Sequence, residues 1–213
     1  MRKCSTLLTT ILTTLIAALS ISNSAIAHEA GDIILRAGVA NVSPDVTDKV
    51  AGGALSIDVE DNTQIGLTAA YLLTPQFGVQ LLGASPFSHD VTAGGTVVGS
   101  TKHLPPTVTL QWYPAVSESV HPYVGIGINY TTFWDSELNA TGQAATGASK
   151  LGLTYSTGLA LEAGVDVKMA ENIYLNAAVW KVDINTDVKL DGVKVGELEI
   201  DPLAFMIGVG YKF

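Results

Sequence analysis

The sequence predicts an all-β protein, an eight-stranded antiparallel transmembrane β-barrel of the outer-membrane type. Three observations lead to this prediction. The chain begins with a secretory leader, the remainder alternates apolar and polar residues in segments of strand length, and an aromatic-rich segment runs to the final residue. A barrel that crosses a membrane must pair its last strand with its first, because an open edge would leave backbone groups without partners in lipid.

The first 27 residues have the features of a signal peptide. Arg2 and Lys3 precede an apolar run over 7–21, and Ala25 and Ala27 form a small-x-small cleavage site. We therefore expect residues 1–27 to be removed and residues 28–213 to form a single β-barrel domain.

Composition and charge exclude several other classes of protein. The formal net charge is −9, and an acidic exported chain is a poor nucleic-acid binder. The single cysteine, Cys4, lies in the leader, so we expect no disulfide and no thiol nucleophile in the mature chain. After residue 27 no apolar run approaches the roughly 20 residues of a membrane helix. A mature chain of this sequence that spans a membrane would therefore do so with strands.

The first four expected strands each carry an apolar row on one face and small or polar residues on the other. The row over 33–39 opposes Ile34, Arg36, Gly38 and Ala40, and the row over 65–73 opposes Gln64, Gly66, Thr68 and Ala70. The third and fourth apolar rows take every second residue of 77–81 and 104–112.

The last four expected strands repeat this pattern. Their apolar rows take alternate residues of 124–130, 153–165, 173–179 and 203–213. Each of the eight strands is near the roughly 9–11 residues that cross a bilayer at a tilt. We find no segment with a helical period.

The connections between these strands alternate between long and short. The long ones cover 43–62, 86–101, 135–150 and 185–196, and the short ones 74–76, 114–122 and 168–172. Outer-membrane barrels have long loops outside and short turns in the periplasm, so both termini are expected on the periplasmic side.

A soluble eight-stranded barrel of the lipocalin kind is the main alternative fold. It would place its apolar rows inside and charged residues outside, whereas the second rows here contain mostly Gly, Ala, Thr, Ser, Gln and Asn. Lys or Arg at the middle of a lipid-facing row costs about 2–4 kcal/mol, and no apolar row has one near its centre. Aromatic residues lie toward the row ends, as in a membrane girdle: Tyr71, Trp112, Tyr130 and Tyr211. These features favour the membrane barrel.

Five stretches resemble the outer-membrane protein W (OmpW) family. They are HEAGDIILRAG (28–38), DNTQIGLT (61–68), KHLPPT with QWY (102–107 and 111–113), PYVGIGINYTTFWD (122–135) and the terminal DPLAFMIGVGYKF. The resemblance implies an eight-stranded barrel in the cell outer membrane with a narrow, largely hydrophobic lumen. It also implies passive uptake or efflux of small apolar molecules.

The last strand is similar to the terminal strand of bacterial outer-membrane proteins, whose final aromatic residue is read by the barrel insertion machinery. Tyr211 and Phe213 are the corresponding residues here. The further partners we expect are outer-membrane lipid, lipopolysaccharide and small apolar solutes. Lipopolysaccharide contact by so acidic a chain would need divalent cations or local basic residues.

The inward rows supply the candidate functional residues. Leu82, Trp180 and Met206 are large, apolar and near mid-height, so we expect them to form a lumen constriction. The inward charges Arg36 and Glu162 are expected to pair, either as a polar plug that sets selectivity or as a purely structural pair. A small channel or carrier for hydrophobic molecules is the favoured function. A narrow ion-conducting pore, and a non-transporting membrane anchor or surface receptor, are the alternatives.

Two other motifs carry little functional weight. Ser88, His89 and Asp90 are adjacent, and adjacent residues of an extended chain alternate faces, so they cannot form a catalytic relay. His89 and His103 flank one loop, but a metal site would need further ligands. We expect no enzyme, no cofactor and no metal.

Overall fold

The computed structural model describes residues 28–48, 50 and 57–213. The expected signal peptide, with Ala25 and Ala27 at its cleavage site, lies outside the described residues.

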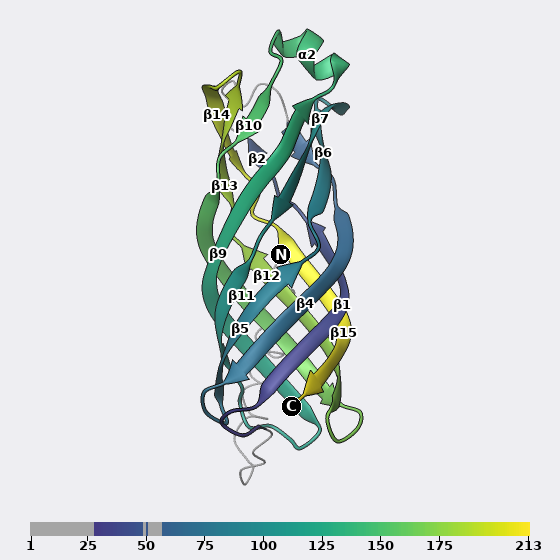
Figure 1. Ribbon diagram of the computed structural model, residues 1–213, viewed down its shortest axis with the longest axis vertical. Coiled ribbons are helices and arrows are strands. Elements are labelled where there is room, and N and C mark those ends of the chain that lie inside the picture. The colour runs from purple at the N-terminus through teal and green to yellow at the C-terminus, as the bar shows by residue number, and fades with distance from the viewer. Residues whose placement is uncertain (1–27, 49, 51–56) are drawn as a thin grey trace, which may run out of the picture.

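Within this part of the chain, eight strands close into an antiparallel barrel, as the sequence predicts (Figure 1). β15 pairs with β1 through Gly208 and Gly38, and β11 pairs with β9, so the sheet has no free edge at these strands. The barrel strands are β1 (Ile33–Ser43), β4 (Asn62–Leu72), β5 (Phe77–Ala84), β8 (Thr107–Trp112), β9 (Val120–Leu138), β11 (Ser156–Lys168), β12 (Ile173–Val182) and β15 (Leu203–Lys212).

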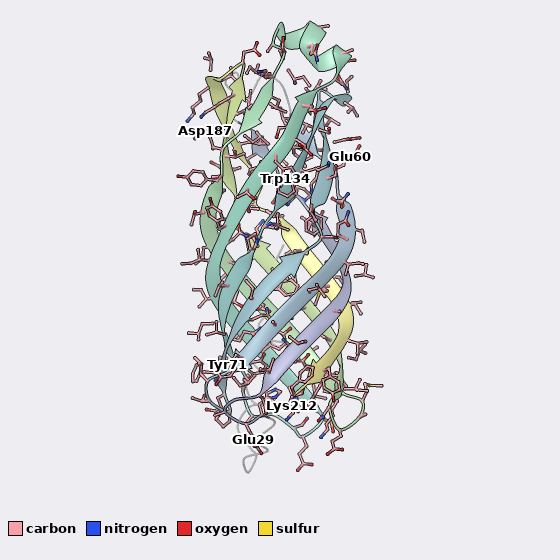
Figure 2. The ribbon with its side chains drawn as sticks, viewed as in Figure 1. Glu29, Glu60, Tyr71, Trp134, Asp187 and Lys212 are labelled. Carbon is pink, nitrogen blue, oxygen red and sulfur yellow. The ribbon has the colours of Figure 1, made fainter. Side chains whose placement is uncertain are left out.

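The outward face of the barrel is apolar because the alternating rows point as predicted. Ile65 on β4 is 64% exposed and Ile207 on β15 is 51% exposed, values that suit contact with lipid rather than water. Tyr71, Phe77, Trp112 and Tyr211 lie toward the end with short turns, and Tyr130 and Tyr155 lie together toward the other end. The two ends are visible in Figure 2, where Tyr71 and Lys212 mark one and Glu60 and Asp187 the other.

The expected long loops are not simple loops, and this expectation was wrong. β6 (Phe87–Ala93) and β7 (Thr96–Leu104) form a hairpin, and β7 pairs with the far end of β9. β3 (Ile57–Val59) pairs with β6. On the other side, β13 (Asn185–Leu190) and β14 (Val193–Glu199) form a second hairpin, which pairs with β10 (Leu151–Leu153) and β2 (Thr47–Asp48). These strands extend the barrel wall past the ends of the other barrel strands, on the side away from the short turns (Figure 1).

A short helix, α2 (Ala140–Thr146), lies at the tip of this extension and was not predicted. The Asn139 side chain accepts a hydrogen bond from the Gly142 amide at its start, and Gly147 ends it in the left-handed conformation. No helix in residues 28–48, 50 and 57–213 is long and apolar enough to cross a membrane.

Candidate functional site

The interior of the barrel has two regions of opposite character. The periplasmic region contains a hydrogen-bonded network of charged and polar side chains, and the extracellular region contains apolar cavities. The expected row of small and apolar lumen residues is therefore wrong for the periplasmic region.

Arg36 on β1 is the centre of the polar network. Its Nε donates to Asp166 Oδ1 at 2.9 Å and its Nη2 donates to Asp166 Oδ2 at 2.5 Å, which makes a bidentate ion pair. Nη1 donates to Gln80 Oε1 and Nη2 to Tyr113 Oη, both at 3.1 Å. The guanidinium carbon lies 5.1 Å from the centre of the Tyr123 ring. With 1% of its surface exposed, Arg36 has exchanged water for these partners.

Glu162 on β11 is the second acid of the network, and neutral donors surround it. It accepts hydrogen bonds from Gln80 Nε2 at 2.6 Å, Thr109 Oγ1 at 2.7 Å and Gln111 Nε2 at 3.0 Å. The structure thus confirms that Arg36 and Glu162 both point inward. It corrects the expectation that they pair, because the ion-pair partner of Arg36 is Asp166 and Gln80 bridges Arg36 to Glu162.

The network fills the lumen at its level. Its side chains come from β1, β5, β8, β9, β11 and β12, and Asn176 on β12 donates to both Asp166 and Tyr123. Gly164 on β11 makes room for Tyr123, since a Cβ there would lie 2.4 Å from the Tyr123 ring. Reaching the periplasm through the lumen would require this buried network to separate.

Two histidines close the periplasmic end below the network. His28 and His121 are both buried, and their ring centres lie 4.9 Å apart. The His28 ring also packs edge-on against Tyr113 at 4.9 Å. Packed aromatic rings thus close this end of the barrel.

An apolar cavity of about 340 Å³ occupies the extracellular extension. It lies between the two hairpins, which explains why a reading of 86–101 and 185–196 as loops could not reveal it. Aliphatic and aromatic side chains from the barrel ends and both hairpins make up most of its wall, among them Val42, Val91, Phe133, Leu153, Ile184, Val188, Leu198 and Ile200.

A second cavity of about 40 Å³ lies next to the first, and Val42, His103, Ile184 and Pro202 line both. The expected constriction residues Leu82 and Trp180 line this lower cavity. Met206 is fully buried. It lies beside this cavity, since a Cβ on the lining residue Gly66 would be only 2.8 Å from the Met206 sulfur. The structure thus brings the three predicted residues to one level.

Trp180 marks the boundary between the two regions. It lines the lower cavity, and its backbone pairs in register with Glu162 of the polar network. The lower cavity, lined by Leu82 and Trp180, therefore lies directly on the extracellular side of the charged network.

His89 and His103 face the upper cavity from β6 and β7. Their rings stack with centres 4.9 Å apart, and Phe87 stacks on His103 at 5.5 Å. Burial lowers the pKa of His89, and burial together with the charge of His89 lowers the pKa of His103 to about 3, so both rings are neutral at physiological pH. No group of three metal-ligating side chains is present among residues 28–48, 50 and 57–213. Ser88 and Asp90 are exposed on the opposite face of β6 from His89.

Sequence reasoning missed several members of the network. Asp166, Gln80, Thr109 and Gln111 all occupy inward positions of their strands, and the parity of each row gave that orientation. The missing information was the stagger between strands, which decides that Asp166, rather than Glu162, reaches Arg36.

A closed antiparallel barrel with an apolar outer band and aromatic ends is a transmembrane barrel of the outer-membrane class. The chain belongs to the OmpW family, whose model matches residues 29–213. It is 44% identical to Outer membrane protein W of Vibrio cholerae over 209 residues, which cover 93% of this chain and 95% of the relative. It is 43% identical to Outer membrane protein W of Escherichia coli over 202 residues, covering 91% and 93%.

Solved structures agree with this assignment. The crystal structure of the outer membrane protein OprG from Pseudomonas aeruginosa aligns with a TM-score of 0.78 at 38% identity, covering 88% of this chain and 98% of that one. The protein is thus located in the cell outer membrane. The start of β1 and the end of β15 lie side by side at the end of the barrel with the short turns, the periplasmic side.

Proposed function

We propose that this barrel is a passive channel or carrier for small hydrophobic molecules, which enter the extracellular cavity and leave sideways into the membrane. One observation carries the proposal: an apolar cavity in the extracellular extension is separated from the periplasm by a buried charged network. An apolar solute gains free energy by entering the cavity but would lose it on separating Arg36 from Asp166.

The wall beside the lower cavity offers a sideways route. The hydrogen-bonded ladder between β5 and β8 ends at the pair Leu82 and Thr107. Pro105 and Pro106, which come immediately before Thr107 in the sequence, have no N–H group and cannot donate to extend this ladder. Gly83 and Pro105 both line the lower cavity, and a Cβ on Gly83 would meet no atom within 4 Å. Gly83 has the outward parity of Leu81, so this break in the hydrogen-bonded wall, beside the lower cavity, is the exit that the proposal requires.

The proposal explains how the protein could pass a molecule that lipopolysaccharide excludes. The solute would avoid the polar outer leaflet by entering from outside, and it would then join the hydrocarbon layer directly. The partners implied are lipopolysaccharide and lipid around the barrel and small apolar solutes inside it. The barrel insertion machinery remains a proposed partner too, with Tyr211 and Phe213, whose rings lie 4.6 Å apart, as the insertion signal.

The test is to fill the gap at Gly83. Cells that lack the native protein would express wild type, Gly83→Phe or the control Leu81→Phe, an exposed position two residues earlier on the same face of β5. We expect Gly83→Phe to reduce uptake of a small apolar fluorescent dye to the level of cells without the protein, and Leu81→Phe to have no effect.

Equal amounts of heat-modifiable barrel in the membrane would show that each variant is folded. Wild-type uptake no greater than that of cells without the protein would contradict the transport function and favour the membrane anchor or surface receptor. Full uptake by Gly83→Phe would contradict the sideways route.

A further inference from the structure

We propose that the upper cavity selects apolar molecules that carry one uncharged hydroxyl group, and that the ring of His103 binds this group. The inference rests on the proposed function, because it names the class of molecule that the same cavity would carry.

Among the residues the structure describes, four polar side chains line the upper cavity: His89, Thr101, His103 and Thr146. Thr101 Oγ1 is hydrogen-bonded to Ser136 Oγ at 2.7 Å, and Thr146 Oγ1 donates to the Gly142 carbonyl at 2.7 Å. His89 Nδ1 lies 2.5 Å from the carbonyl oxygen of Glu60. These three side chains already use a polar atom within the protein.

His103 differs from them. Its ring contacts are with the rings of Phe87, His89 and Phe133, and none of the hydrogen bonds between described residues involves its ring nitrogens. The residue is 7% exposed, and it lines both the upper and the lower cavity. A molecule that moves from one cavity to the other passes this ring, which can still form hydrogen bonds.

His89 strengthens this polar spot. Because a carbonyl oxygen only accepts, the Nδ1 atom that contacts Glu60 carries the hydrogen, and Nε2 is left as an acceptor. That Nε2 atom is buried and has no hydrogen-bond partner within the described part of the chain. The two stacked imidazoles thus form a polar spot in a largely apolar wall, and His103 is the one that lines both cavities.

The charge of the site decides which polar group fits. Both rings are neutral at physiological pH, and the lining of the two cavities includes no Lys or Arg among the residues the structure describes. A carboxylate would therefore be buried without a counter-charge, which is unfavourable. A neutral imidazole has one donor and one acceptor nitrogen, and a hydroxyl group can satisfy either one. An ether can only accept, and a hydrocarbon can do neither.

The experiment compares four ligands of similar size: 2-naphthol, 2-methoxynaphthalene, naphthalene and 2-naphthoate. Binding to the full-length mature barrel in lipid nanodiscs would be measured by equilibrium dialysis, with empty nanodiscs giving the partition into lipid. The proteins are wild type, His103→Phe and the control His121→Phe, a buried histidine at the periplasmic end that lines neither cavity.

We expect wild type to bind 2-naphthol about tenfold more tightly than naphthalene, the size expected for one hydrogen bond that would otherwise be unmade. Binding of 2-methoxynaphthalene, which can accept from the donor nitrogen only, should lie between the two. Binding of 2-naphthoate should be the weakest. His103→Phe keeps an aromatic ring in the stack and should bind naphthol and naphthalene equally, whereas His121→Phe should keep the preference.

The outcomes separate this inference from the proposed function. If no ligand binds above the empty nanodisc, the cavity does not hold apolar molecules and the proposed function fails. If naphthol and naphthalene bind wild type equally, the function stands and the hydroxyl preference is wrong. A preference that survives in His103→Phe, or naphthoate as the tightest ligand, would also overturn the inference.

Discussion

The two regions of the lumen use opposite chemistry within one barrel. In the periplasmic region, charges and amides fill the cross-section and satisfy one another, with Arg36 and Glu162 both below 5% exposed. In the extracellular region, aliphatic side chains surround open space. The difference shows that a barrel of eight strands, whose interior is only just wide enough for side chains, can still contain an open apolar cavity where hairpins extend its wall.

The two regions are expected to differ in what their side chains contribute, stability in one region and solute passage in the other. The polar region has many internal partners, and Arg36 and Asp166 line neither of the two apolar cavities, so we expect changes there to act mainly on the free energy of unfolding. The apolar region has unfilled volume, so we expect changes there to act mainly on solute passage.

The largest expected effect is the removal of Asp166. Asp166→Ala leaves the buried Arg36 without its ion-pair partner and should destabilise the barrel by about 3–5 kcal/mol. The double change Arg36→Leu with Asp166→Ala should be much less harmful than the sum of the single changes. Denaturant unfolding of the barrel in detergent micelles gives these free energies.

The same cycle with Glu162→Gln in place of Asp166→Ala should show weaker coupling to Arg36, because Gln80 lies between the two side chains. Additive effects of Arg36 and Asp166 would contradict the geometry described above.

Truncation at the boundary between the two regions is expected to have the next largest effect. Met206 is fully buried, so Met206→Ala should lower the free energy of unfolding by about 2–5 kcal/mol, and Leu82→Ala, which is partly exposed, by less. Both should alter uptake of the apolar dye.

Neither truncation should raise ion conductance in planar bilayers, since the charged network remains in place below. A rise in conductance in either single variant would show that the constriction, rather than the network, blocks ions.

Acidification should weaken the extracellular region before the barrel wall. The folded pKa of His103 lies at about 3, below the ordinary value of 6.5, so below pH 6.5 the unfolded state binds more protons and stability falls with decreasing pH. At pH 4.5 this amounts to about 2–3 kcal/mol. The charged neighbours are His89 and, beyond it, Asp61, which raises the pKa of His89.

Hydrogen exchange at pH 7 and pH 4.5 would measure this effect. β6 and β7 should lose protection relative to β12 and β15, and His103→Phe should reduce the loss. Equal loss of protection in all four strands would show that the histidines do not control the response.

The smallest effect is expected at the surface. Lys194 makes ion pairs with Asp187 and Glu197, each at 2.8 Å, on the exposed β13–β14 hairpin. Because water and salt screen exposed charges, Lys194→Ala should leave the unfolding midpoint unchanged within error. A shift comparable to that of Asp166→Ala would mean that burial is not what distinguishes the two ion pairs.

The barrel strands could be predicted from the sequence because lipid contact imposes a strict two-residue period. Ile33 and Ile207 point outward and Arg36 and Trp180 inward, each as its parity indicates. The ion-pair partner of Arg36 could not be predicted, since Glu162 and Asp166 share a face and only the stagger of the strands decides between them.

The sequence contains turn signals for the two extracellular hairpins, and the prediction did not use them. Gly94-Gly95 and Asp191-Gly192 all have positive φ, and such pairs between alternating apolar residues indicate two-residue turns. The apolar cavity could not be predicted without these hairpins. The helix α2 has only seven residues, so its end caps rather than any periodicity mark it.

The central claim is that the extracellular cavity passes apolar molecules while the network below it blocks ions. Its most direct test measures two properties of the wild-type protein: uptake of a small apolar dye by cells, and single-channel current in planar bilayers. We predict dye uptake well above that of cells without the protein and no steady current. A steady ion current without dye uptake would contradict the account and establish a narrow ion-conducting pore instead.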